Sequence, residues 1–311
     1  MAGTAAAESE ASTVSLWPHR LALLAGGATC LLVVIGGLVT TTHSGMAVPD
    51  WPTTFGYNMF LYPWDRLVGG VLYEHVHRLA GSAVGLLTLL LTATIWGTER
   101  EDWLRLLGLA ALGGVIVQGV LGGLRVVLAA DILAMVHGAV APGFLALLAS
   151  LALFTSSPWR AGGPAEAPRH PGLFLGTTVA IYVQIVFGVI LAHRETRLDA
   201  HAGMAGLVSV LVVLSARRAF ASGLGRLRRP AWLLVGLWAV QIVLGLAAFA
   251  VEDRPDLLPV APELGLALLV AHRLVGALML SGSLVLTLQA YRPTRALGAA
   301  HAPGVSGRVP A

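Results

Sequence analysis

Apolar runs of about twenty residues recur along this chain and limit what it can fold into. The 311 residues are 56% hydrophobic and only 12% charged, whereas a soluble domain has about 25% charged residues. Each run is long enough to cross a hydrocarbon core about 30 Å thick. The short alternating segments of a transmembrane barrel are not seen. We therefore predict an all-α polytopic membrane protein with eight transmembrane helices, at residues 21–41, 73–96, 104–128, 132–154, 173–193, 200–220, 231–251 and 264–290.

Arginine placement orients the predicted helices, because the chain contains no lysine. Most arginines precede the first helix, follow an even-numbered helix or lie in the tail, and the positive-inside rule makes that side cytoplasmic. We therefore expect both termini in the cytoplasm and a long outer loop near residues 42–72. Aromatic side chains in this loop could form an interfacial belt or a lid over a buried ligand. The arginines that set this orientation are Arg20, Arg100, Arg105, Arg160, Arg169, Arg217, Arg218, Arg226, Arg228, Arg229, Arg292, Arg295 and Arg308.

A repeated phrase divides the chain into two halves. Gln-x-x-(Leu/Phe)-Gly begins at Gln118, Gln184 and Gln241, on the third, fifth and seventh predicted helices, and Gly36 lies at a similar depth in the first. Small residues let helix backbones approach closely. The pattern predicts two pseudo-symmetric four-helix bundles, with compositional coincidence as the alternative. The predicted segments are an N-terminal cytoplasmic segment 1–20, a bundle 21–155, a cytoplasmic linker 156–172, a bundle 173–290 and a tail 291–311.

Four histidines lie on the even-numbered helices, at similar depth near the outer face. His77 pairs with His137 in the first half, and His201 with His272 in the second. Imidazoles on facing helices of a bundle can take both axial positions of a haem iron, so this pattern predicts two haem sites. A lone histidine could instead bond a carbonyl across a helix interface. Zinc is a weaker alternative, because it requires three or four converging ligands.

Two arginines and one carboxylate accompany these histidines. Arg78 and Arg273 directly follow their histidines, within the repeated His-Arg-Leu-x-Gly phrase, and are candidates for contacts with haem propionates. Snorkelling to the interface is the alternative for each arginine. Glu74 lies three residues before His77, on the same helix face, and could move protons during an oxidation. It could also face water or pair with an arginine. The second half has no counterpart to Glu74, so the first site is the better candidate for chemistry.

These phrases resemble the haem A synthase family of eight-helix membrane proteins. The resemblance rests on the residues 36–40, on Ser44-Gly45 and Pro49-Asp50-Trp51-Pro52, and on Glu74-x-x-His77-Arg78, His137-Gly138 and His272-Arg273-Leu274-x-Gly276. It extends from the first predicted helix to the eighth. Many bacterial members carry a cysteine pair in the first outer loop, whereas the single cysteine here, Cys30, lies in the first predicted helix.

The resemblance implies an enzyme of the bacterial cytoplasmic (inner) membrane. It would oxidise the C8 methyl of haem O to the formyl of haem A by successive hydroxylations. By this resemblance, His77 and His137 hold the substrate haem, Glu74 is catalytic, and His201 and His272 bind the iron of a haem B cofactor. Implied partners are haem O, the lipid bilayer, a haem O synthase and terminal oxidase assembly factors. We expect no nucleic-acid partner, and a homo-oligomer is left open.

Two other functions stay open from the residues alone. One is a di-haem membrane cytochrome that transfers electrons without oxidising the porphyrin. The other is a haem-handling or transport protein. Glu74, present beside one histidine pair only, favours the enzyme.

Overall fold

Eight long helices make up this protein in a computed structural model, which describes residues 15–162, 168 and 170–292. All eight are long and apolar enough to cross a membrane. The prediction of an all-α polytopic membrane protein is confirmed. The helices are α1 (Trp17–Thr41), α2 (Gly69–Thr98), α3 (Asp102–Val127), α4 (Asp131–Phe154), α6 (Gly172–Arg194), α7 (Leu198–Ala221), α8 (Gly225–Glu252) and α9 (Pro262–Ala290).

The predicted helix ends agree with the observed ones to within a few residues, except at α8. That helix begins at Gly225, six residues before the predicted start, and includes Pro230. Hydropathy detects only the part of a helix that lies in hydrocarbon. The first turns of α8 carry three arginines, which the apolar pattern excludes, although the backbone is already helical.

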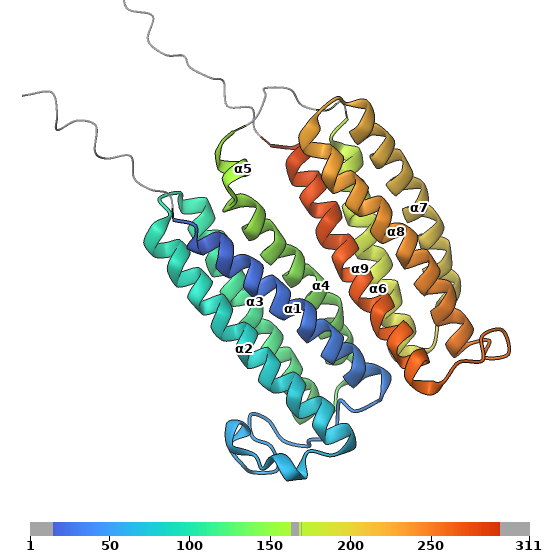
Figure 1. The fold of residues 1–311 in the computed structure, drawn as a ribbon. Coiled ribbons are helices and arrows are strands. Elements are labelled where there is room, and N and C mark those ends of the chain that lie inside the picture. Colours follow the sequence, from blue (N-terminus) through green and yellow to red (C-terminus); the bar gives the residue numbers. More distant parts are fainter. Residues whose placement is uncertain (1–14, 163–167, 169, 293–311) are drawn as a thin grey trace, which may run out of the picture.

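The helices pack as two groups of four that lie side by side (Figure 1). In the first group α1 packs against α2 and α4, and α3 packs against the same two helices. In the second, α6 and α8 each pack against α7 and α9. Each group has its own apolar core, represented by Leu91 and Leu148 in the first and by Val212 and Leu234 in the second. The groups meet mainly where α9 contacts α4 and α1. The predicted segment boundaries and the pseudo-symmetry stay predictions.

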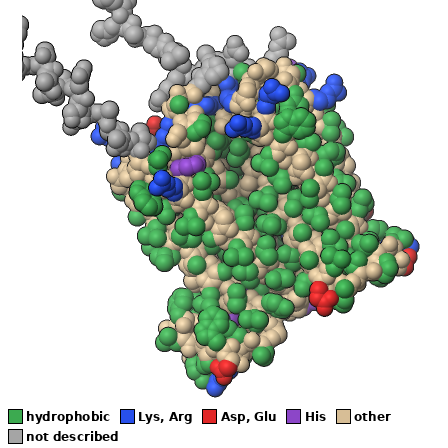
Figure 2. Space-filling model, in the orientation of Figure 1, with side chains coloured by type: hydrophobic (Ala, Val, Ile, Leu, Met, Phe, Trp, Pro, Cys, Tyr) green, Lys and Arg blue, Asp and Glu red, His purple; other side chains and the backbone are tan. Residues whose placement is uncertain are grey.

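Large apolar side chains cover the outside of the helices as well as the cores. Leu23, Leu86, Val210 and Leu246 are all more than half exposed. Figure 2 shows such side chains spread over the middle of the face that it draws. Contiguous apolar surface of this extent needs a non-aqueous solvent, because soluble proteins rarely expose large apolar patches. The surface agrees with the membrane-spanning character of the helices.

Charged side chains gather at the two ends of the helices. On the face drawn in Figure 2, most arginines lie at the end that carries the short helix α5 (Ser157–Arg160), and most of the visible acidic side chains lie at the other end. The predicted orientation, with the arginine-rich end in the cytoplasm, stays a prediction. Three of the arginines behind it, Arg169, Arg295 and Arg308, lie outside the described residues.

A long connection, residues 42–68, joins α1 to α2, and we call it the first loop. It contains two single-turn 3₁₀ helices, η1 (Met59–Leu61) and η2 (Trp64–Arg66). Figure 1 shows it folded against the ends of the first helix group, away from α5. We call this end of the protein the loop end. Helices α2, α4, α7 and α9 all begin at the loop end, so the predicted histidines lie in their first turns, within about three turns of the start.

Candidate functional site

The structure brings together both predicted histidine pairs. His77 on α2 and His137 on α4 have ring centroids 6.3 Å apart, with an angle of 81° between the ring planes. His201 on α7 and His272 on α9 also have centroids 6.3 Å apart, with a 70° angle. Each pair lies inside one helix group.

The spacing within each pair fits two imidazoles on opposite faces of one metal ion. With a metal–nitrogen bond of about 2.0 Å, and about 1.1 Å from that nitrogen to the ring centre, the centroids are expected about 6.2 Å apart. Within the described residues there is no cluster of three or more histidine, cysteine or acidic side chains able to hold a metal ion. Two histidines are therefore enough only for a metal that already has other ligands, such as the iron of haem, which the porphyrin nitrogens bind. The donor set fits haem better than zinc.

A glycine on the neighbouring helix makes room for each of these four imidazoles. At every one of these glycines, a Cβ atom would lie 3.0–3.4 Å from the Cε1 atom of the histidine. The sequence predicted these glycines as helix-packing positions, but it did not show what packs on them. The structure shows that a ring edge fills the space that a side chain would occupy. The four contacts join Gly36 to His77, Gly122 to His137, Gly188 to His201, and Gly245 to His272.

The contact at Gly36 predicts a large effect of a branched side chain. Gly36→Val is expected to displace the His77 imidazole, because even a Cβ atom would lie 3.0 Å from its Cε1. Haem bound per chain at the first pair should fall several-fold, as measured by pigment extraction and absorbance. Gly26→Val on the same helix is the control, because nothing lies within 4 Å of its Cβ position. Equal haem content in the two variants would contradict the role given to Gly36.

The polar partners of the imidazoles differ between the pairs. The Nδ1 atom of His137 lies 3.1 Å from the carbonyl oxygen of Gln118, and a proton on Nδ1 would leave Nε2 free to bind a metal. The side-chain amides of Gln184 and Gln241 lie against ring nitrogens of His201 and His272, at 3.2–3.4 Å. Each of the three repeated glutamines thus contacts a histidine of a pair, and the contacts of Gln184 and Gln241 include the Nε2 atoms of His201 and His272. The Nδ1 atoms of His77 and His272 are buried and have no hydrogen-bond partner among the described residues.

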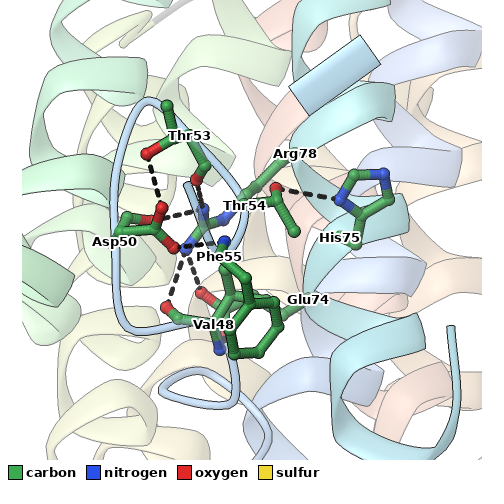
Figure 3. A network of polar contacts seen from close by, with 8 residues as sticks. All are labelled: Val48, Asp50, Thr53, Thr54, Phe55, Glu74, His75 and Arg78. Carbon is green, nitrogen blue, oxygen red and sulfur yellow. Dashed lines mark hydrogen bonds and ion pairs between the residues drawn. The ribbon is translucent and has the colours of Figure 1, made fainter. Parts of the chain in front are cut away.

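Glu74 is buried at the loop end of α2, with 4% of its surface exposed. Its Oε2 accepts a hydrogen bond from the backbone N–H of Val48 at 2.9 Å, and its Oε1 accepts one from Nη2 of Arg78 at 2.6 Å. Figure 3 shows these contacts joining α2 to the first loop. Pairing with an arginine was one of the alternatives for this residue. The predicted catalytic role of Glu74 stays a prediction, and the structure gives the carboxylate an anchoring contact as well.

Arg78 points into the first loop. Its Nη1 donates to the carbonyls of Asp50 at 2.7 Å and Thr53 at 3.0 Å, and its Nη2 donates to the carbonyl of Val48 at 3.1 Å. Together with Glu74, these acceptors engage both Nη atoms (Figure 3). The predicted propionate contact of Arg78 stays a prediction, and the contacts observed here fix the path of the loop over α2.

The Asp50 carboxylate closes the turn that Arg78 holds. It accepts hydrogen bonds from the hydroxyl of Thr53 and from the N–H groups of Phe55 and Gly56, the latter two at 2.7 and 2.8 Å. Slight burial raises the pKa of Asp50, but these hydrogen bonds to the ionised form outweigh it and hold the pKa below its ordinary value. The turn is therefore stabilised by a charged carboxylate at neutral pH.

Other contacts hold the first loop over α2 and α3. The Nδ1 atom of His75 lies 3.2 Å from the hydroxyl of Thr54, so this histidine faces the loop and is not part of a pair. The ring of Tyr62 packs on His75, with centroids 5.4 Å apart. The indole of Trp51 lies where a side chain at Gly123 would be. Among the loop aromatics, Tyr62 is buried whereas Trp64 is exposed. Some aromatic side chains of the loop therefore pack against the helices, and others lie on the protein surface.

Arg273 connects the two helix groups. Its Nη1 donates to the carbonyl of Gly37 at 2.9 Å and to the hydroxyl of Thr41, both on α1. The guanidinium is thus engaged across the contact between α9 and α1. Its predicted propionate contact stays a prediction.

Arg125, near the end of α3, is a residue that the sequence analysis did not single out. It lies close enough to His77, His137 and Glu74 to interact with them electrostatically. The signal that could have revealed it is its position three residues after Gly122 in the repeated phrase, on the same helix face.

Eight helices able to span a membrane, with two pairs of partly buried histidines, define a multi-pass helical membrane protein. Within that class, residues 65–202 match the COX15-CtaA family, described as a cytochrome oxidase assembly protein. The matched segment includes Glu74, Arg78, His77, His137 and His201. The family resemblance that the sequence predicts is confirmed over this segment.

Two curated relatives agree with the family match, and both are named heme A synthase. The protein of Methylobacterium sp. (strain 4-46) is 30% identical over 58% of this chain and 58% of its own length. The protein of Beijerinckia indica subsp. indica is 31% identical over 58% of this chain and 58% of its own length. The aligned part of this chain thus spans somewhat more than half the length of each relative.

Proposed function

We propose that this protein is a haem A synthase, which oxidises the C8 methyl of haem O to the formyl of haem A by successive hydroxylations and loss of water. The observation that carries the proposal is the equal spacing, 6.3 Å, of two histidine pairs inside an eight-helix membrane protein. The similarity to proteins named heme A synthase supports the choice of reaction.

In this proposal the first pair holds the substrate and the second pair holds a cofactor. His77 and His137 bind the iron of haem O, and His201 and His272 bind the iron of haem B. Haem B, when bound, supplies a store for electrons removed from the substrate. Glu74 lies on α2 one turn before His77 and takes up or releases protons near the substrate's edge. The first loop covers the loop end of this site and keeps water from it.

The proposed location follows from the charges at the helix ends. The arginine-rich end would face the cytoplasm, and the loop end would face outward from the bacterial inner membrane. Both histidine pairs then lie near the outer face. A haem O synthase and terminal oxidase assembly factors are the expected partners in the same membrane.

A second candidate function is a di-haem electron-transfer cytochrome. One observation favours it: both oxygens of Glu74 are already engaged, by the N–H of Val48 and the guanidinium of Arg78. A carboxylate held in this way serves as an anchor without any acid–base role. This function needs both histidine pairs but no chemistry on the porphyrin.

Pigment analysis separates the two functions. The chain is produced together with a haem O synthase in a host that makes no haem A, and the extracted haems are separated by chromatography. We expect haem A, or its hydroxylated intermediate, only where both proteins are present. Cells with the haem O synthase alone are the control. A purified protein that carries two haems while haem O accumulates unchanged would establish the cytochrome instead.

A further inference from the structure

Arg125 is the basic residue in the last turn of α3. It follows Gly122, the glycine on which His137 packs, by three residues. Residues three apart lie on one face of a helix. Arg125 is therefore one turn closer to the loop end than the His137 ring, on the helix face that meets the first histidine pair.

The guanidinium of Arg125 lies against the backbone of Gly45 in the first loop. A Cβ atom at Gly45 would overlap Cζ and both Nη atoms of Arg125, so only glycine leaves room for this side chain. The loop backbone thus holds the guanidinium from one side. The half-buried side chain is also close enough to His77 and His137 to interact with them electrostatically.

Arg125 has no acceptor for its donors within the part of the chain that the structure describes. Glu74 and Asp131 are near enough to attract it electrostatically, but neither forms an ion pair or hydrogen bond with it. Arg78 and Arg273, by contrast, are engaged by backbone carbonyls and other oxygens. No guanidinium nitrogen of Arg125 is among the fully buried polar atoms without a partner in the described residues, so these donors are accessible to a ligand. An anionic ligand group would supply the acceptors that they lack.

The second histidine pair has no counterpart of this arginine. The residues three positions after Gly188 and Gly245 are Leu191 and Ala248. A cation at this position is therefore specific to the first pair. Any anion that it recognises belongs to the ligand of that site.

We propose that Arg125 binds a propionate carboxylate of the porphyrin held between His77 and His137, and so fixes which edge of the macrocycle points to the loop end. The inference rests on the proposed function, because it needs a haem at the first pair. A guanidinium can donate two parallel hydrogen bonds to a carboxylate, which sets direction as well as affinity. With the propionate edge held there, the opposite edge of the macrocycle points deeper into the helix group.

The test compares a porphyrin that has carboxylates with one that does not. Full-length protein with His201→Ala and His272→Ala, which leaves only the first pair, is titrated with iron protoporphyrin IX and with its dimethyl ester. Arg125→Leu should weaken binding of the free acid about tenfold or more and leave the ester unchanged. Arg125→Lys keeps the charge but cannot donate two parallel hydrogen bonds, so its affinity for the free acid should lie between those of the native chain and Arg125→Leu. Arg66→Leu is the control, because this exposed loop arginine contacts the hydroxyl and the ring of Tyr57, and neither histidine pair.

The comparison also works in the chain with native Arg125, so the test survives a variant that does not fold. There the free acid should bind about tenfold or more tightly than the ester. Equal affinity of the two porphyrins would overturn the proposal, as would equal weakening of both by Arg125→Leu, which indicates a structural role only. These readouts measure binding. Failure to form haem A in the pigment experiment therefore leaves them interpretable.

Discussion

His77→Ala is expected to remove most of the haem bound at the first pair, whereas His75→Ala should leave it in place. His77 faces His137 with ring centroids 6.3 Å apart, and its loss removes one of two protein ligands to the iron. His75 is two residues away on the same helix, but it faces Thr54 of the first loop. Both variants remove an imidazole from the same helix, but only His77→Ala removes one that faces a second histidine.

The measurement is haem per chain in purified protein, together with its absorption spectrum. His77→Ala should lose about half of the bound haem, or convert one haem from a six-coordinate to a five-coordinate spectrum. A second matched comparison is His201→Ala against His193→Ala, because His193 bonds the carbonyl of Val189 one turn earlier in its own helix. If His75→Ala or His193→Ala altered the spectra as strongly as their partners, the ligand assignment would be wrong.

Glu74→Gln is expected to stop haem O oxidation while haem binding persists. The amide oxygen can still accept the N–H of Val48, so the first loop stays anchored, but the side chain can no longer carry a proton between groups. Loss of a general acid–base residue lowers the rate about 10²- to 10⁴-fold. Glu99→Gln is the control, since Glu99 forms a partly buried ion pair with Arg160 at the opposite end of the helices.

Comparison with Glu74→Ala separates the two roles of the carboxylate. The alanine variant loses both contacts. Haem O oxidation should again be lost, and the first loop should in addition become more sensitive to proteolysis. Full oxidation in Glu74→Gln together with reduced oxidation in Glu74→Ala would show that Glu74 only anchors the loop. The measurement is haem A formed per chain in cells that also make haem O.

Much of the fold could be predicted from the sequence, because the bilayer imposes a simple rule. A helix must bury about 20 residues in hydrocarbon, and the apolar runs have that length. The histidine pairs also followed from position alone, since each of the four lies near the loop end of an alternate helix. What hydropathy missed at α8 was a helical extension that carries arginines outside the apolar run.

The direction of individual polar side chains was not predictable in the same way. Glu74 lies three residues before His77 and four before Arg78, and both spacings place partners on one helix face. The structure shows the carboxylate with Arg78 and with Val48, 26 residues away in the chain. No local pattern encodes that contact, because the path of the first loop depends on many such distant hydrogen bonds.

By itself the sequence determined a membrane protein of eight helices with two histidine pairs, because hydrophobic length and helix direction are local properties of the chain. Only the tertiary structure decided that four glycines seat the imidazoles, that Arg78 and Arg273 are engaged by backbone carbonyls, and that Arg125 lies against Gly45 of the first loop. Those outcomes depend on how closely separate segments approach, and close packing between segments is set by the whole fold.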